Sequence, residues 1–141
     1  MNSHSLSEIK REIEQIGRRL GCPRNCLPTF GFSEDFGCPH IEVNASGLHY
    51  VVVERGVELE RKTTHDLNDL LYIVFEAVTF SMAGDYELKH RIPGQDSRRI
   101  LFRRQLELLG SVDADWVTRL RQDQHKILAC NPFNDGVESA R

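Results

Sequence analysis

One apolar stretch, residues 66–91 with the sequence DLNDLLYIVFEAVTFSMAGDYELKHR, constrains the fold of this chain most strongly. Its apolar residues recur three and four positions apart, which is the spacing of one face of an α-helix. Tyr72, Ile73, Ala77 and Phe80 fill much of the opposite side. A helix that is apolar on most of its circumference must be covered on more than one face. The stretch therefore predicts a central helix around which the other elements pack.

Hydrophobic periodicity divides the rest of the chain into helices and one block of strands. Residues 7–20 carry apolar side chains on one side and charges on the other, which predicts an amphipathic helix. Residues 41–64 alternate apolar and polar side chains around turn residues, and they predict a three-stranded antiparallel meander. Residues 97–109 and 113–130 predict two further helices, and Gly110 is expected to end the first of these.

The expected fold class is α+β: an N-terminal helix, a three-stranded antiparallel meander sheet, then three helices packed on one face. A length of 141 residues suits a single domain. Outside the elements, residues 21–40 predict an irregular loop rich in proline and glycine, and the polar tail, residues 134–141, is expected to be frayed. If Arg55 and Gly56 form the last hairpin loop, Val52 lies opposite Leu59 on the face toward the helices.

Composition is typical of a soluble globular protein, with 40% hydrophobic and 28% charged residues. No apolar run approaches the ~20 residues of a membrane-spanning helix, and no apolar targeting segment is present at the N-terminus. We therefore expect a cytoplasmic protein with reduced thiols that does not bind a membrane. The net charge of −3 argues against general nucleic-acid binding.

Charge changes sign at the end of the predicted central helix. Residues 65–88 contain five acidic residues and no lysine or arginine, whereas residues 89–104 contain six basic residues and one acidic residue. Either the two segments neutralise one another, or one of them faces a charged partner. The basic segment includes a possible stripe on the third helix that could bind phosphates, which leaves a nucleic-acid-binding protein as one alternative function. The stripe consists of Arg98, Arg99, Arg103 and Arg104.

Three cysteines and a histidine could serve as zinc ligands, because Cys22, Cys26, Cys38 and His40 fall within nineteen residues. Neither pair lies on a recognisable knuckle or hairpin turn, and buried or incidental thiols are common in a reducing cell. We expect no metal and no cofactor, with a small zinc-binding regulatory protein kept as an alternative. The chain has no nucleotide-binding, serine-hydrolase or zinc-protease motif, which indicates that it is not an enzyme.

Four segments carry a resemblance through their order and spacing: VVVERGVELERKTT, TFSMAGDYELKHR, DSRRILFRRQLELLG and ILACNPFND. Together they resemble the bacterial immunity protein 63 family of polymorphic toxin systems, over about residues 39–135. The positions that match the family pattern are Glu54, Arg55, Gly56, Tyr86, Leu88, Arg91, Asp96, Arg98, Arg99, Phe102, Leu108, Leu109, Trp116, Pro132 and Phe133.

The resemblance implies an antidote that binds the toxic C-terminal domain of a secreted effector and blocks it by occlusion, without chemistry or a small-molecule substrate of its own. Two roles are open for some of the matching residues. They contact the toxin, or they form a structural network whose ion pairs stabilise the turn between the second and third helices. These are Glu54, Arg55, Tyr86, Arg91, Asp96, Arg98, Arg99 and Trp116.

The acid-rich stretches suggest where the toxin would bind if it is a basic nuclease. Complementary charge raises the association rate and enforces the choice of partner. On this basis Glu58, Glu60, Asp85 and Glu87 are predicted to contact the toxin.

Overall fold

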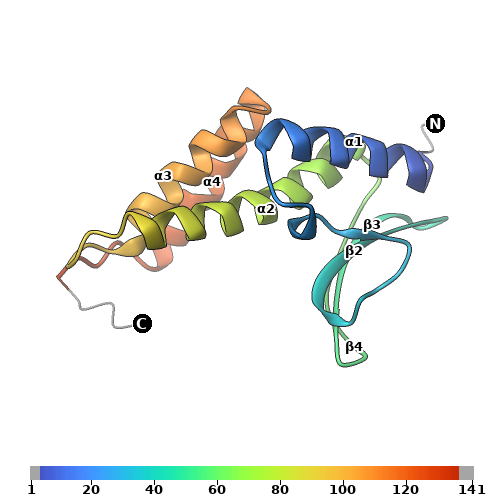
Figure 1. Cartoon of the computed structure of the whole chain (residues 1–141), viewed down its shortest axis with the longest axis horizontal. Coiled ribbons are helices and arrows are strands. Elements are labelled where there is room, and N and C mark those ends of the chain that lie inside the picture. The colour runs from blue at the N-terminus through green and yellow to red at the C-terminus, as the bar shows by residue number, and fades with distance from the viewer. Residues whose placement is uncertain (1–3, 137–141) are drawn as a thin grey trace. The chain divides into compact units, whose positions relative to one another are not determined.

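The structure, a computed structural model, describes residues 4–136, and this part contains four α-helices and a four-stranded sheet (Figure 1). The predicted fold class, α+β with an N-terminal helix, an antiparallel sheet and three further helices, is confirmed, although the sheet has four strands instead of the predicted three. The elements are α1 (Leu6–Leu20), the 3-10 helix η1 (Arg24–Cys26), β1 (Thr29–Phe30), β2 (Phe36–Asn44), β3 (Gly47–Glu54), β4 (Val57–Thr64), α2 (Leu67–Lys89), α3 (Ser97–Gly110) and α4 (Ala114–Cys130).

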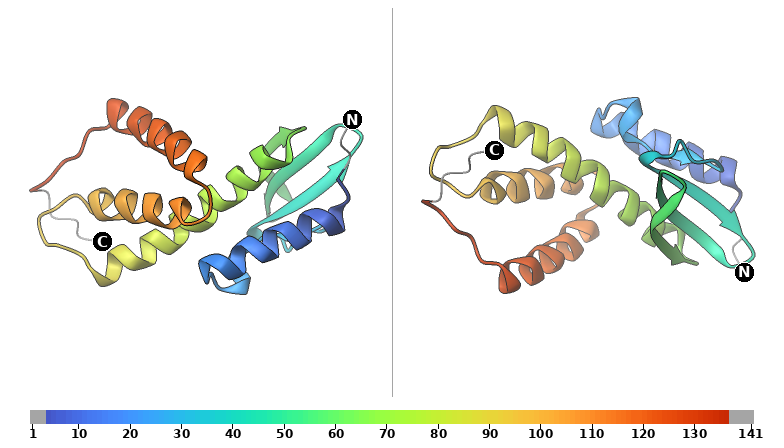
Figure 2. Two further views of the ribbon diagram at one scale, coloured as in Figure 1. Left: turned by 90° about the horizontal axis from the view of Figure 1, so that it is seen from above. Right: turned by 90° about the horizontal axis from the view of Figure 1, so that it is seen from below.

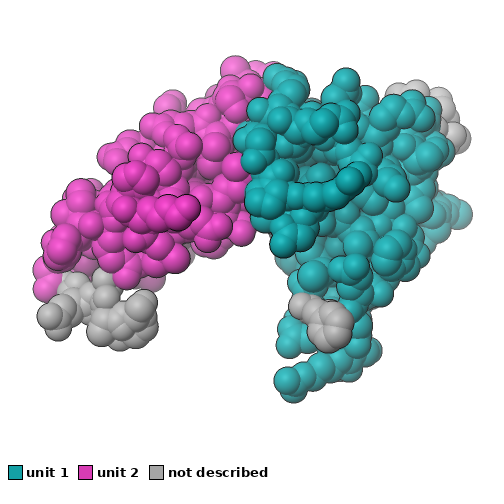
Figure 3. Space-filling view, viewed as in Figure 1, with its two compact units in different colours: residues 1–75 teal, residues 76–141 magenta. Residues whose placement is uncertain are grey.

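The chain separates into two compact units, which are coloured separately in Figure 3. Unit 1 spans residues 1–75 and contains α1, the sheet and the first part of α2. Unit 2 spans residues 76–141 and contains the rest of α2 with α3 and α4. The expectation of a single domain stays a prediction.

The sheet of unit 1 has the strand order β1-β2-β3-β4. β2, β3 and β4 form the predicted antiparallel meander, while β1 adds a two-residue parallel strand on the outer side of β2. β2 begins at Phe36, five residues before the predicted start of the meander, and it runs through Pro39. Proline is tolerated there because β1 pairs only with His40 and Ile41, so this part of β2 is an edge next to a register shift. Much of the predicted irregular loop is therefore regular structure.

The β3–β4 hairpin has the predicted two-residue loop but a different register. Arg55 and Gly56 have φ angles of 54° and 74°, and positive φ at both positions is the type I′ geometry that matches strand twist. A bulge follows, because Val53 pairs with Glu58 whereas Val52 pairs with Glu60. The predicted pairing of Val52 with Leu59 is therefore wrong, since Leu59 is the extra residue in the bulge.

Helix α1 starts and ends with strong capping signals. Ser5 and Glu8 form a reciprocal capping box, and Gly21 takes the left-handed conformation at the C-terminal end. Ile9 and Ile13 are fully buried, as are Ile41 of β2 and Leu70 of α2. These residues form the core of unit 1, and α1 lies beside β1 and β2 (Figures 1 and 2).

Unit 2 is built around the helical hairpin of α3 and α4, whose chains run in opposite directions (Figure 2). Asp96 caps α3 and Asp113 caps α4, each by accepting a backbone N–H two residues later. The buried Gln105 amide donates to the Glu76 carbonyl over 2.9 Å. The apolar core of this unit consists of Val78, Ala83, Ile100, Phe102, Leu109, Trp116 and Leu120.

Helix α2 is long and apolar enough to cross a membrane by length and composition alone, and 44% of its most apolar window is buried. The expectation that no helix of this kind is present came from uninterrupted apolar runs alone. Charged residues interrupt the apolar runs of α2, but they are few over its most apolar window. The core helix of a water-soluble protein meets the same criterion. The absence of membrane binding stays a prediction.

Candidate functional site

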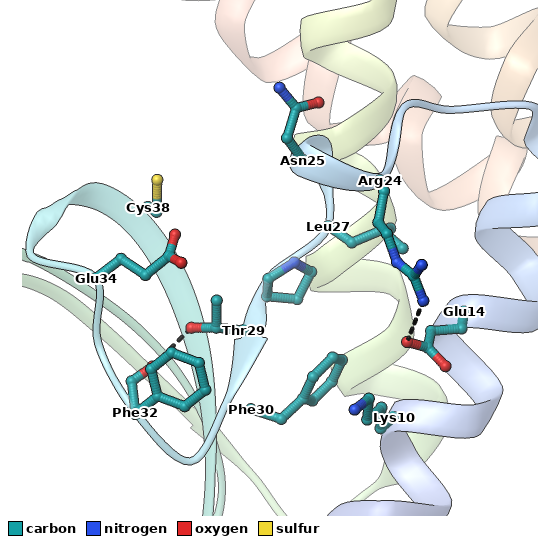
Figure 4. A pocket seen from close by; sticks show the side chains of 11 residues that line it. Lys10, Glu14, Arg24, Asn25, Leu27, Thr29, Phe30, Phe32, Glu34 and Cys38 are labelled. Atoms are coloured by element: carbon teal, nitrogen blue, oxygen red, sulfur yellow. Dashed lines mark hydrogen bonds and ion pairs between the residues drawn. The ribbon is translucent and has the colours of Figure 1, made fainter.

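A hollow of about 630 Å³ opens in unit 1 between α1, η1, β1 and β2 (Figure 4). Lys10 and Glu14 project from α1 on one side, and Phe32, Glu34 and Cys38 lie on the other. The volume falls in the range of sites that hold small molecules or anchoring side chains of a partner. Its lining residues are Lys10, Glu14, Arg24, Asn25, Leu27, Pro28, Thr29, Phe30, Phe32, Glu34 and Cys38.

Several polar contacts lie along the wall of this hollow. Arg24 lies 3.7 Å from Glu14, and the ammonium of Lys10 lies 6.0 Å from the centroid of the Phe30 ring. The Thr29 hydroxyl donates to the Phe32 carbonyl over 2.6 Å, while the Phe32 side chain is 59% exposed. The sequence hypotheses did not include this hollow, and its only signal was the group of aromatic residues within the predicted irregular loop.

A chain of charged side chains crosses one face of the sheet. His40 contacts Glu42 over 2.7 Å, Glu42 accepts from Arg61 over 3.2 Å, and Arg61 donates two hydrogen bonds to Glu58. The hydrogen bond from His40, assisted by Arg61, lowers the pKa of Glu42, and the hydrogen bonds from Arg61 lower the pKa of Glu58. These contacts fix Arg61 in place and satisfy its charge within the chain.

The imidazole of His40 is 4% exposed, and its Nδ1 atom has no hydrogen-bond partner in the part of the chain that the structure describes. A buried polar atom without a partner is uncommon in folded proteins. Nδ1 of His40 does not contact a cysteine among the described residues. The imidazole is therefore the buried end of the chain of charged side chains, and it contacts Glu42.

β4 is the exposed edge of the sheet. Seven of its eight residues are exposed, including Val57 at 58% and Leu59 at 59%. Two of the predicted toxin contacts lie here, and both have cations nearby: Glu58 pairs with Arg61 and Glu60 lies 3.4 Å from Lys62. The edge therefore combines exposed apolar side chains with charges that cancel locally.

The other two predicted toxin contacts lie on α2 within unit 2. Asp85 is exposed. Glu87 is only 3% exposed, and it accepts hydrogen bonds from Arg91 over 2.8 and 3.0 Å, one helical turn later. Arg91 is thereby paired with Glu87, whereas the predicted network placed it with Asp96.

Asp96, Arg98 and the C-terminal segment form a clasp, which we define as residues 94–99 with residues 131–136. Arg98 donates to Asp96 over 2.8 Å and to the carbonyls of Asn131 and Pro132. The same carboxylate oxygen of Asp96, Oδ2, also accepts the Asn134 N–H over 2.9 Å. The clasp thus joins the α2–α3 connection to the chain that follows α4.

A second ion pair completes the clasp. Arg99 pairs with Asp135 over 2.9 Å, and its guanidinium lies 4.2 Å from the centroid of the Phe133 ring. Asp135 also accepts the Asp96 N–H over 2.8 Å. Residues 134–136 of the predicted frayed tail are bound here, and residues 137–141 lie outside the described residues.

The remaining residues of the predicted network lie elsewhere. Tyr86 stacks on His90 at 4.0 Å between ring centroids, and Arg104 lies over the Tyr86 ring at 4.4 Å. Trp116 is buried in the core of unit 2. Glu54 and Arg55 belong to the β3–β4 hairpin of unit 1.

The zinc ligand set proposed from Cys22, Cys26, Cys38 and His40 does not assemble. All four residues are described, and within residues 4–136 no group of three or more histidine, cysteine or acidic side chains could hold a metal ion. Burial raises the pKa of the Cys22 thiol, with a further contribution from nearby Cys26, which disfavours the thiolate that zinc requires. The structure therefore gives no support to the zinc-binding alternative.

The arginine stripe on α3 is largely used within the chain. Arg98 and Arg99 belong to the clasp, and Arg104 lies over Tyr86 and pairs with Glu107 over 3.2 Å. Arg103 is exposed. Because three of the four guanidinium groups already have acidic partners, phosphate binding by this stripe has no support in the structure.

Comparison with known families gave one result. A family model described as Immunity protein 63 matches residues 44–126, which is more than half of the chain. Comparisons with curated proteins and with solved structures found no match. The matched range begins at Asn44, the last residue of β2, and ends within α4. The lining of the hollow and the C-terminal part of the clasp lie outside it.

Proposed function

The chain belongs to the immunity protein 63 family, and we propose that it binds the toxic domain of a cognate bacterial effector and neutralises it by covering its surface. The family match is the single observation that carries this proposal. Toxin neutralisation follows from the family in general terms, and occlusion without catalysis is our proposal for the mechanism. We further propose that the protein acts in the cytoplasm of the cell that it protects.

The four acidic residues that we propose as toxin contacts differ in exposure and in pairing, so they contribute differently to binding. Asp85 is exposed and attracts a basic toxin over a distance. Glu58 and Glu60 have cations nearby, so they act only at short range, after Arg61 or Lys62 turns away from them and leaves the carboxylates to the toxin. Glu87 contributes least, because it is buried and paired with Arg91.

The test uses the toxic C-terminal domain encoded beside the gene for this chain, expressed in a sensitive host with and without it. Co-expression should restore growth, and the two purified proteins should form a stable complex without turnover of the toxin. Growth that stays blocked despite soluble expression of this chain, or the absence of any neighbouring toxin gene, would contradict the proposed function.

The contact surface is tested with charge reversals in the same complex. At low salt, Asp85→Lys should weaken binding of a basic toxin about 5- to 10-fold, and the pair Glu58→Lys with Glu60→Lys should weaken it further. Glu12→Lys is the matched control, because Glu12 is an exposed acid on α1 outside the proposed surface. Equal effects of Asp85→Lys and Glu12→Lys would remove Asp85 from the contact surface while leaving the function intact.

A further inference from the structure

The outer edge of β4 is the most accessible template for strand pairing in unit 1. An edge strand presents a row of backbone N–H and C=O groups that no neighbouring strand uses. β4 is eight residues long and contains no proline, whereas β1 at the other edge of the sheet has only two residues. β1 also interrupts the outer side of β2, so β4 offers the longest unbroken row of edge groups in the described sheet.

The charges of β4 have an order that is complementary to itself. Glu58 and Glu60 occupy its first half, and Arg61 and Lys62 follow directly. If a second β4 runs antiparallel to the first, the acidic half of each strand faces the basic half of the other. A parallel second copy would instead place like charges opposite one another, which is destabilising.

One antiparallel register satisfies both the charges and the alternation of side chains. Glu60 and Lys62 lie on the same face of the sheet, opposite Val52 and Tyr50 of β3. When the two-fold axis passes through Arg61, Glu60 of each copy lies opposite Lys62 of the other. The two Arg61 side chains near the axis already have acidic partners of their own, namely Glu42 and Glu58.

Exposed apolar side chains add a reason for this edge to be covered. Val57 and Leu59 are both more than half exposed, and Leu59 is the bulge residue that has no position opposite it in the β3 register. In the register through Arg61, Leu59 lies opposite Thr63 of the second copy. Exposed ion pairs contribute little to affinity, so backbone hydrogen bonds and the burial of these side chains supply most of it.

We propose that β4 pairs antiparallel with β4 of a second copy of this chain to form a symmetric dimer. The pairing is isologous and therefore closes at two copies instead of extending into a fibre. A single pair of edge strands buries an area at the small end of specific interfaces, so the dimer dissociates readily on dilution. The dimer does not require the toxin, so its main test uses this chain alone.

The test is sedimentation velocity of the full chain at low salt over a range of protein concentrations. Wild-type protein should show a monomer–dimer equilibrium. Glu60→Lys and Lys62→Glu should each raise the dimer dissociation constant about tenfold, because each places two like-charged pairs across the axis. Glu12→Lys, the same charge change on α1, should leave the equilibrium unchanged.

Restoration of the dimer provides the decisive result. The double variant with Glu60→Lys and Lys62→Glu in one chain should dimerise again, and an equimolar mixture of the two single variants should form a heterodimer. Circular dichroism of each variant checks that the fold is kept. Wild-type protein that stays monomeric, or single variants that are not restored by mixing, would overturn the proposal. Monomeric protein whose toxin complex is weakened by both single variants would assign the edge to the toxin instead.

Discussion

At the scale of single residues, Asp96 shows how one carboxylate can hold several segments together. It caps α3 through the Arg98 N–H, pairs with the Arg98 guanidinium and accepts the Asn134 N–H. The hydrogen bond from the Arg98 side chain is the largest reason why the pKa of Asp96 lies well below its ordinary value. Protonating this group therefore weakens the cap and the clasp at the same time.

We predict that the Asp96 carboxylate makes the protein less stable in acid. Because its folded-state pKa is lowered, its contribution is fully present above the unfolded-state pKa of about 3.9 and is lost as pH falls from about 5 toward the folded-state value. Asp96→Ala should lower the free energy of unfolding by about 2 kcal/mol at pH 7, because it removes both the cap and the ion pair. Asp96→Asn keeps a capping oxygen and should cost only about 1 kcal/mol.

Urea unfolding at pH 7 and pH 3 measures both effects. The difference in stability between the wild type and Asp96→Asn should shrink as pH falls, since at pH 3 the Asp96 carboxyl of the unfolded chain is largely protonated whereas that of the folded chain stays ionised. Glu12→Gln serves as a control, because it removes an exposed carboxylate that has no part in the clasp. A difference that stays constant between the two pH values would show that the Asp96 charge does not stabilise the clasp.

At the scale of elements, the glycine at the end of α3 allows close helix packing and does not reverse the direction of the chain. The sequence suggests that Gly110 ends the helix, but α3 includes it and the next residue, Ser111, stays right-handed at φ −71° and ψ −14°. A Cβ atom at position 110 would lie 2.9 Å from Cγ2 of Val117 on α4. The missing side chain thus permits the close approach of α3 and α4.

We predict that the sign of the Gly110→Ala effect depends on Val117. Alanine in a helix is favoured over glycine by about 1 kcal/mol, whereas overpacking costs about 1 to 3 kcal/mol. Gly110→Ala should therefore lower the free energy of unfolding in the wild-type background. In a Val117→Ala background the clash is absent, and the same substitution should stabilise the protein. A double-mutant cycle by urea unfolding measures this coupling, and additive effects would contradict close packing at this point.

At the scale of the whole molecule, the sequence predicts the features that repeat and misses those that depend on a single residue or a distant partner. The helices and the meander have periodic side chains over many residues, so periodicity predicts their order. One extra residue, Leu59, moves the register of β4 by a position, and no periodic signal reports a bulge. Glu87 belongs to an acidic stretch, yet its burial depends on how α2 packs and on Arg91.

Contacts between distant residues explain the other differences. Asp135 lies 36 positions after Arg99, and nothing local in the polar C-terminal sequence indicates that the two form an ion pair. β1 has only two residues, which is too short for any alternation to be visible. The hollow likewise arises where α1, η1 and the sheet edge meet, so only the aromatic residues of the loop gave a partial signal.

The residues that the family model matches are fewer than the residues that form the folded structure, and this difference leads to a prediction. The matched residues 44–126 omit α1, nearly all of β2 and the C-terminal half of the clasp. Ile9, Ile13 and Ile41 of the omitted region are fully buried, and β2 pairs with β3 along nearly the whole length of β3. A fragment of residues 44–126 loses these contacts, so it should not unfold cooperatively. A fragment of residues 4–136 should keep the transition of the full chain. Urea unfolding followed by Trp116 fluorescence and circular dichroism compares them, and a cooperative transition in the shorter fragment would show that α1 and β2 are dispensable for folding.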